Sequence, residues 1–94
     1  MQQQRRTAFV TGASQGIGAA IAVALARDGF DVAVSSTRPE KLSDVLAKIR
    51  AAGGRAAPVA LDVRSQASIE KAMAEVVGAL GPIDVLINNA AVPL

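Results

Sequence analysis

The sequence predicts an α/β fold with a doubly wound parallel sheet. Short apolar runs at 8–11, 30–36, 55–63 and 83–87 alternate with stretches of helical periodicity at 17–28, 37–52 and 66–80. The links between these segments are short, which favours parallel strands and right-handed crossovers. Only 2% of the residues are aromatic, so the core must be built from Ala, Val, Leu and Ile. Such a core suits helices packed closely on both faces of a sheet.

Composition excludes several classes of protein. The chain has 94 residues, enough for one domain, and a net charge of +2. Scattered charges and few aromatic residues do not support nucleic-acid binding. Cysteine and histidine are absent, so we expect neither a disulfide framework nor a metal site. The longest fully apolar run, 17–26, is too short to cross a bilayer, and the N-terminus lacks the apolar core of a secretory signal. We expect a cytoplasmic protein with no membrane partner.

The first strand, 8–11, leads into glycines at positions 12, 16 and 18 and then directly into a helix. Amides at a helix start have no internal partner, and the helix dipole adds about 0.3–1 kcal/mol of attraction for an anion. Gly12 would allow a tight turn, Gly16 the approach of a pyrophosphate, and Gly18 close packing of helix on strand. The spacing departs from the commoner Gly-x-Gly-x-x-Gly. The alternative is that the glycines only shape a turn, but the flanking strand and helix favour phosphate binding.

Apolar residues recur at helical spacing in the predicted helices. Gly29 is placed to end the helix at 17–28, and its nearly all-round apolar surface calls for cover on more than one side. In the second helix, Thr37-Arg38-Pro39-Glu40 fits a capping box. The residues at helical spacing in the first helix are Ile17, Ala20, Ile21, Ala24 and Leu25. In the second helix, the stripe predicted to face the sheet is Leu42, Val45, Leu46 and Ile49.

The third strand is predicted to centre on residues 59–61, and Ser65 is a good N-cap for the third helix. Gly81 and Pro82 would end that helix, whose predicted inward residues are Ile69, Met73, Val76, Val77 and Leu80.

The four predicted strands all end in polar or glycine residues, namely Gly12, Ser36, Asp62 and Asn89. Because the strands are parallel, these ends should meet at the carboxyl edge of the sheet. Open α/β sheets bind their ligands at that edge. The sequence therefore predicts a ligand site there.

Three motifs at strand ends carry a family resemblance: 11–18 (TGASQGIG), 61–63 (LDV) and 88–90 (NNA). With them, the chain resembles the N-terminal half of a short-chain dehydrogenase/reductase, nearest to the 3-oxoacyl-(acyl-carrier-protein) reductase-like group. The resemblance implies a Rossmann-type sheet with strand order 3-2-1-4. Residues 1–94 would be the N-terminal part of a single dinucleotide-binding domain that stops after its fourth strand.

The resemblance also implies roles for individual residues. Asp62 and Val63 would lie at the adenine, with the Asp62 carboxylate accepting a hydrogen bond from the amino group; alternatively, Asp62 only begins the following helix. Asn89 and Ala90 would lie near the ribose between adenine and nicotinamide. Asn88 would instead tie neighbouring strands through backbone hydrogen bonds. The family's usual glycine after this motif is replaced by Ala91, a small change. Around the cofactor's phosphates and adenine ribose would lie Gly12, Ser14, Gln15, Gly16, Ile17 and Gly18.

The end of the second strand predicts which cofactor is preferred. An acidic residue there would bind the ribose hydroxyls of NAD and repel a 2′-phosphate. Here the chain has three hydroxyls and a guanidinium instead, from Ser35, Ser36, Thr37 and Arg38, and arginine pairs well with phosphate. We expect NADP rather than NAD. The alternative is that Thr37 merely caps a helix and Arg38 is solvated.

The family's chemistry needs a tyrosine, a lysine four residues later and a serine. The chain has no tyrosine, and its lysines lie on predicted helices, so no catalytic residue is predicted. We expect the cofactor half of an NADP-dependent oxidoreductase that transfers hydride between nicotinamide and a small carbonyl or secondary alcohol. The alternative is a non-catalytic dinucleotide-binding module that pairs with a partner. An apolar strand at 83–87 would be left at a sheet edge, which indicates a fragment of a longer reductase. The resemblance implies that the full-length protein is a homo-oligomer.

Overall fold

The computed structural model describes residues 5–90 and contains one sheet with strand order β3-β2-β1-β4. All three pairs of neighbouring strands are parallel. The predicted doubly wound sheet with order 3-2-1-4 is therefore confirmed. The strands are β1 (Thr7–Val10), β2 (Asp31–Ser36), β3 (Ala56–Ala60) and β4 (Val85–Ile87).

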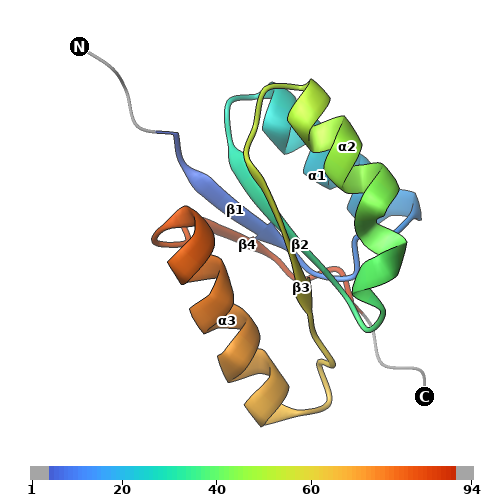
Figure 1. Ribbon diagram of the computed structural model, residues 1–94, viewed down its shortest axis with the longest axis vertical. Helices are drawn as coiled ribbons and strands as arrows, with labels where there is room; N and C mark the ends of the chain where they lie inside the picture. Colours follow the sequence, from blue (N-terminus) through green and yellow to red (C-terminus); the bar gives the residue numbers. More distant parts are fainter. Residues whose placement is uncertain (1–4, 91–94) are drawn as a thin grey trace.

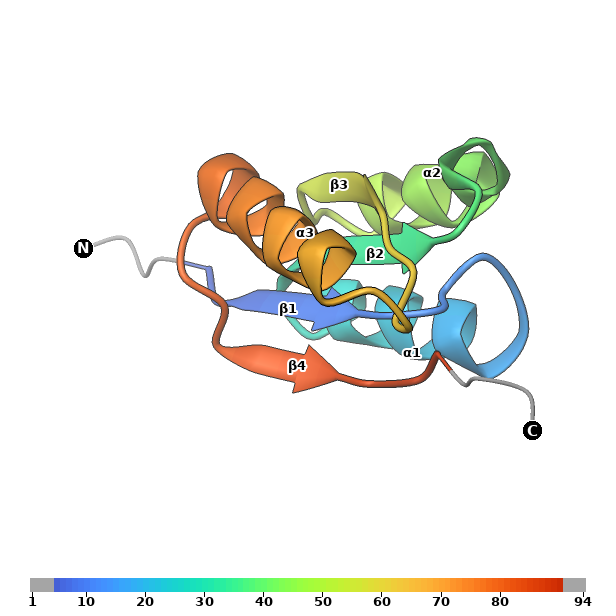
Figure 2. The same ribbon diagram turned by 90° about the horizontal axis from the view of Figure 1, so that it is seen from below.

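Helices cover both faces of this sheet. They are α1 (Gly16–Arg27), the 3₁₀ turn η1 (Pro39–Leu42), α2 (Ser43–Ala51) and α3 (Gln66–Leu80). Figures 1 and 2 show α1 and α2 side by side on one face and α3 on the other. Each helix returns the chain to the amino edge, so every strand runs towards the same carboxyl edge.

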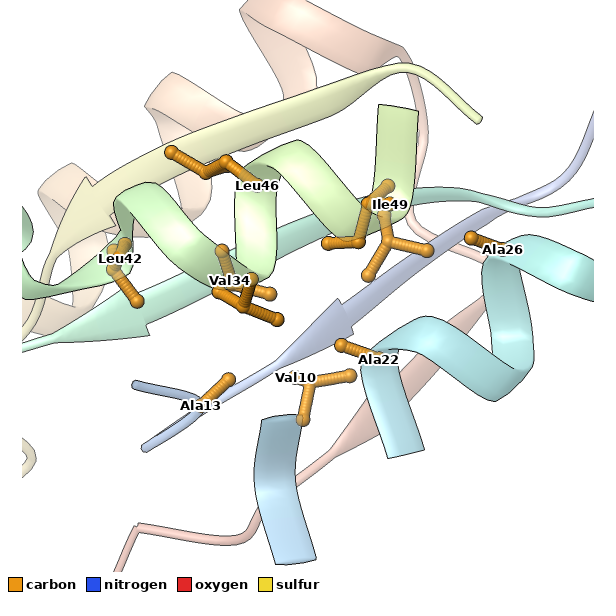
Figure 3. Packing of buried hydrophobic residues seen from close by; sticks show 10 residues of the cluster. Val10, Ala13, Ala22, Ala26, Val34, Leu42, Leu46 and Ile49 are labelled. Atoms are coloured by element: carbon orange, nitrogen blue, oxygen red, sulfur yellow. The ribbon is translucent and has the colours of Figure 1, made fainter. Parts of the chain in front are cut away.

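The face under α1 and α2 is packed with small and branched aliphatic side chains. All four residues predicted to point inward from the second helical segment are buried, which confirms that stripe. The buried residues of this cluster are all aliphatic, and the aromatic Phe30 packs against them only partly buried, so the helices can lie close to the strands. Figure 3 shows this cluster, with Val10 and Val34 from the sheet, Ala22 and Ala26 from α1, and Leu42, Leu46 and Ile49 from η1 and α2.

The apolar residues at helical spacing in α1 coincide only in part with its inner face, since of the five only Ile21 and Leu25 pack against the core. The buried row is Gly18, Ala22 and Ala26, whereas Ile17 is 74% exposed. Of the other residues at that spacing, Ala20 and Ala24 are exposed, and Ile21 and Leu25 are only partly buried. The helix is apolar nearly all round, so spacing alone could not choose its inner face.

The inner face of α3 is also shifted from the prediction. Val76 and Leu80 are buried as expected, but the third residue of the buried row is Ala72. Ile69 is 38% and Val77 47% exposed, so their predicted burial is wrong. The predicted stripe was based on the spacing of the large apolar residues. The structure instead buries Ala72, whose short side chain allows close contact with the sheet.

The predicted capping box at residues 37–40 does not form. Arg38 is extended, with φ −125° and ψ 91°, and helical structure begins only at Pro39. A residue before proline is disfavoured in the helical region, so Arg38 cannot be the first helical residue after a Thr37 cap. The Ser36 hydroxyl instead accepts a hydrogen bond from the Arg38 amide at 3.1 Å.

The chain between β3 and β4 is close to the prediction. β3 ends at Ala60, earlier than predicted, although the Leu61 amide still donates to the Ser36 carbonyl at 3.1 Å. Ser65 caps α3 as expected, since its hydroxyl accepts from the Ser68 amide at 3.1 Å. β4 lies at one edge of the sheet, and Leu86 on it is 52% exposed.

Asp31, at the start of β2, is a buried carboxylate that ties the amino edge together. It is 2% exposed and accepts hydrogen bonds from Arg5 Nε at 2.9 Å, Arg55 Nε at 3.0 Å and the Arg55 amide at 2.9 Å. Burial alone would raise the pKa of Asp31, but the bonds from Arg55 and Arg5 outweigh it, so the pKa lies below its usual value.

We expect Asp31→Asn to lower the free energy of unfolding at pH 7 by about 1–3 kcal/mol, because the arginines lose a charged acceptor. The folded-state pKa is depressed, so the carboxylate's contribution is fully present above the unfolded pKa of about 3.9. It is lost as the pH falls through the folded-state pKa, and wild type and variant should then converge. Urea unfolding at several pH values measures this.

The matched control is Asp28→Asn, at an exposed position after α1. It should change stability by less than about 0.5 kcal/mol at every pH. An equal loss in both variants would contradict a special role for Asp31.

Candidate functional site

Hydrogen bonds continue past the strand ends and bring the four predicted polar ends together at the carboxyl edge. The Thr11 amide donates to the Ile87 carbonyl at 3.0 Å, and the Ala13 amide to the Ser35 carbonyl at 2.9 Å. The bond from Leu61 to Ser36 joins the third strand to this edge. The segments that carry Gly12, Ser36, Asp62 and Asn89 are thus direct neighbours, as the parallel sheet predicts.

Two of the three glycines are fixed by close contacts. Gly12 has φ 64°, and a Cβ there would lie 2.9 Å from Ala90 Cα. A Cβ at Gly18 would lie 2.5 Å from the Gly12 carbonyl oxygen and 2.6 Å from Asn89 Nδ2. Gly12 is therefore needed for the turn and for contact with the β4 loop, and Gly18 for helix packing. These contacts agree with the predicted structural roles.

Gly16 differs from the other two because nothing lies within 4 Å of the Cβ position there. It has φ 66°, a conformation that disfavours other residues, and it is the first residue of α1. The preceding Gln15 is extended and its side chain makes no capping hydrogen bond. The first turn of α1 also has no acidic residue. Its amides are open to a ligand, and an anion there would meet no repelling carboxylate from that turn.

The glycine segment also borders a groove of about 660 Å³ between α1 and α2. Ser14, Gln15 and Gly16 line its end at the loop, and Lys48 lines it from α2. The neighbouring Ile17 projects from the first turn of α1 with 74% of its surface exposed. Of the predicted phosphate-side residues, Ser14, Gln15, Gly16 and Ile17 are therefore accessible, whereas Gly18 is buried.

The Thr11 hydroxyl joins the loop after β1 to the loop after β4. It accepts hydrogen bonds from the amides of Asn89 at 3.0 Å and Ala90 at 3.1 Å, and donates to Asn88 Oδ1 at 3.1 Å. One donor and two acceptor positions are all used. Asn89 Nδ2 adds a bond to the Gly12 carbonyl at 3.0 Å.

Asn88 thus ties two strands, as predicted, but through a side-chain contact rather than through backbone bonds. Thr11 is only 4% exposed, and no separate role was predicted for it from the sequence. The sequence feature that could have indicated its role in joining the two loops is its position directly before Gly12. Ala91, next to this loop, lies outside the described residues.

At the end of β2, Ser35 and Ser36 have different roles. Ser35 is 1% exposed, and its hydroxyl accepts from the Gly12 amide at 3.2 Å, so it holds the glycine turn. It was predicted only as one of the hydroxyls at this strand end. Ser36 holds the Arg38 amide, as described above. Thr37 and Arg38 are exposed, and within residues 5–90 the Arg38 guanidinium makes no hydrogen bond or ion pair. A cation is therefore available beside the glycine turn.

At the end of β3, the Asp62 carboxylate is paired with Arg64. Oδ1 accepts from the Arg64 amide and from Nε, both at 3.0 Å, and Oδ2 accepts from Nη2 at 3.1 Å. These bonds lower the pKa of Asp62 below its usual value. The Asp62 amide donates to the Ser68 hydroxyl at 2.9 Å, so the residue does take part in the start of α3. Its side chain is nevertheless 40% exposed and remains accessible.

Val63 lies on the opposite side of the sheet edge from the glycine groove. Together with Phe9, Thr11 and Asn88 it lines an apolar cavity of about 180 Å³ between the sheet and α3.

Within residues 5–90 no cluster of three or more His, Cys, Asp or Glu side chains could hold a metal ion. In the same part of the chain, no helix has the length and hydropathy needed to span a membrane.

Comparisons with known proteins agree on one family. The family model described as short chain dehydrogenase matches residues 6–94. The short-chain dehydrogenase/reductase eriH of Hericium erinaceus is 45% identical over 89 residues, which cover 90% of this chain and 35% of that protein. The chain spans between about a fifth and about a third of the length of these curated relatives.

Solved structures give the same result. A variant of actinorhodin polyketide ketoreductase with NADPH is 44% identical and superposes with a TM-score of 0.88, covering 99% of this chain and 36% of that one. A metagenomic short-chain oxidoreductase in complex with NADP is 45% identical with a TM-score of 0.85, covering 93% of this chain and 39% of that one.

We expect Thr11→Val to lower the free energy of unfolding by about 1–3 kcal/mol, because two loop amides and the Asn88 amide oxygen lose their partner. Valine has nearly the same shape, so the loss reports the hydroxyl rather than packing. Urea unfolding measures the effect. The control is Thr37→Val, on an exposed residue, which should change stability by less than about 0.5 kcal/mol. Equal stability of Thr11→Val and wild type would show that the hydroxyl does not hold the loops.

Proposed function

The chain belongs to the short-chain dehydrogenase family, and we propose that it forms the N-terminal, cofactor-binding part of an NADP-dependent oxidoreductase. Members of this family are oxidoreductases that act on small molecules. The observation that carries the proposal is the carboxyl edge of the sheet. There a helix start without a side-chain cap, an arginine that is unpaired within residues 5–90 and an accessible carboxylate lie at the same edge as the glycine turn.

The pyrophosphate would bind at the start of α1. The open space around Gly16 and the free amides of the first helical turn support this, as does the absence of an acidic residue in that turn. Ser14, Gln15 and Ile17 would contact the phosphates and the adenine ribose. Gly12 and Gly18 would act by holding the turn and the helix in place.

The 2′-phosphate of NADP would bind at the end of β2. Arg38 provides a guanidinium that can pair a phosphate with two hydrogen bonds, and Ser36 and Thr37 provide hydroxyls. The bond from the Arg38 amide to Ser36 orients this segment at the edge. NADPH and NADP in two related structures add support for this cofactor over NAD.

The adenine would lie at the end of β3, with the Asp62 carboxylate accepting from the base's amino group. Val63 would contact the base from the side of the sheet edge that faces α3. Asn89 and Ala90 would contact the ribose that lies between adenine and nicotinamide. Their placement supports this role, because the Thr11 hydroxyl and the Gly12 carbonyl hold both residues beside the glycine turn.

The bound nicotinamide would supply or accept the hydride exchanged with a carbonyl or secondary alcohol. The chain contains no tyrosine, so the proton-transferring residues of the family would be provided outside these 94 residues. On this proposal the chain alone binds cofactor and does not turn it over. The whole protein would act on a small carbonyl or alcohol as a homo-oligomer in the cytoplasm.

The absence of tyrosine also favours a second candidate, a dinucleotide-binding module without catalysis. The coding sequence beyond the codon for Leu94 separates the two. A downstream Tyr-x-x-x-Lys would support the enzyme, whereas a stop codon, with an intact mass for residues 1–94 alone, would support the module.

We expect Arg38→Ala to weaken NADPH binding about tenfold and to leave NADH binding nearly unchanged, because only NADPH carries the 2′-phosphate. Ser36→Asp should go further and reverse the preference, since its carboxylate would repel that phosphate and bind ribose hydroxyls. Titration of nucleotide fluorescence with each variant measures both effects.

Arg50→Ala is the control, since it removes the same charge from an exposed position near the end of α2. It should bind both nucleotides as wild type does. Equal weakening of NADH and NADPH by Arg38→Ala would contradict the 2′-phosphate site. Failure of the wild-type chain to bind either nucleotide would contradict the proposed function.

A further inference from the structure

Arg64 makes more hydrogen bonds to Asp62 than a chance surface contact would. Its amide, Nε and Nη2 all donate to the carboxylate, at 3.0, 3.0 and 3.1 Å. Nε and Nη2 form the two-pronged contact typical of arginine with a carboxylate. The Arg64 side chain is 68% exposed and that of Asp62 40%. Exposed pairs contribute little to stability, so the main effect of this pair is on the orientation of the carboxylate.

The backbone around Asp62 is already held in place. The Asp62 amide donates to the Ser68 hydroxyl at 2.9 Å, and its carbonyl accepts from the Ser65 amide at 3.0 Å. The remaining freedom of the residue is rotation of its side chain. The terminal torsion of aspartate is broad, so an unpaired Asp62 carboxylate would sample many orientations. Arg64 selects one of them.

In that orientation the carboxylate has a single unused acceptor position on Oδ2. Oδ1 accepts two hydrogen bonds from Arg64, which use both of its lone pairs. Oδ2 accepts one, which leaves one lone pair free. One acceptor matches the single N–H that an adenine amino group can direct at it.

We propose that Arg64 is a positioning residue for base recognition, which orients Asp62 so that Oδ2 presents one acceptor to the amino group of adenine. The inference rests on the proposed function, because it requires a dinucleotide at this edge. The pair is also neutral as a unit, so the Asp62 charge does not oppose a phosphate at Arg38. In a sequence, this arrangement would be indicated by a basic residue two positions after the aspartate.

The test compares two cofactors that differ only in the base. NADPH carries adenine, whereas reduced nicotinamide hypoxanthine dinucleotide phosphate has a carbonyl in place of the amino group. Both are titrated by fluorescence into the wild-type chain, Arg64→Ala, Arg64→Lys, Asp62→Ala and the double variant of Asp62→Ala with Arg64→Ala. Arg64→Lys keeps the charge but cannot form the two-pronged contact. Arg50→Ala is the charge-matched control at a distant, exposed position.

The wild-type chain should bind the adenine form about three- to tenfold more tightly, the range expected for one net hydrogen bond. Arg64→Ala and Arg64→Lys should both bring this ratio close to one, and so should Asp62→Ala. In the Asp62→Ala background, Arg64→Ala should have no further effect, because its influence passes through the carboxylate. Arg50→Ala should keep the wild-type ratio.

Four results would overturn the inference while leaving the proposed function intact. They are an unchanged ratio in Arg64→Ala, a wild-type ratio in Arg64→Lys, an equal effect of Arg64→Ala in the Asp62→Ala background, and a wild-type chain that binds both cofactors equally well. A wild-type chain that binds neither cofactor would overturn the proposed function as well.

Discussion

The Thr11 hydroxyl is the contact on which the geometry of the candidate site depends. It satisfies the amides of Asn89 and Ala90 and holds the Asn88 side chain, so the loop after β4 lies against the glycine turn after β1. Gly12 must lack a side chain because Ala90 then lies directly against it. The left-handed turn, the helix start and the β4 loop are therefore one unit, and a ligand at the turn would meet both loops.

Close packing determines how α1 is oriented above that unit. Gly18 lies so near the Gly12 carbonyl and the Asn89 amide that no side chain fits. The row that continues from it, Ala22 and Ala26, is consequently the one that faces the sheet. The small core residues in Figure 3 follow from the same constraint, since helices held this close to the strands leave room only for short or branched side chains.

Charge is distributed differently at the two edges of the sheet. At the amino edge, the buried Asp31 is neutralised by Arg5 and Arg55, which is a structural arrangement. At the carboxyl edge, Asp62 is paired with Arg64 in solvent, and Arg38 has no partner within the described residues. The carboxyl edge thus offers an exposed guanidinium together with helix amides that no side chain caps, and an anionic nucleotide would match this combination.

The alternation of strand and helix patterns was enough to predict a parallel sheet and the edge where Gly12, Ser36, Asp62 and Asn89 meet, because periodicity and short parallel connections leave few other arrangements. The strand order 3-2-1-4 was predicted only from the family resemblance. Local turn chemistry also predicted the Ser65 cap.

Three features depended on tertiary contacts. The inner face of α1 was ambiguous in a helix that is apolar all round. The capping box at Thr37 does not form, because Pro39 disfavours the helical conformation at Arg38. The bonds of Thr11 and Ser35 to distant loops have no local pattern, since their partners come together only when the strands pair. Sequence periodicity records which residues prefer burial or a turn, whereas the contacts that orient a site join residues far apart in the chain.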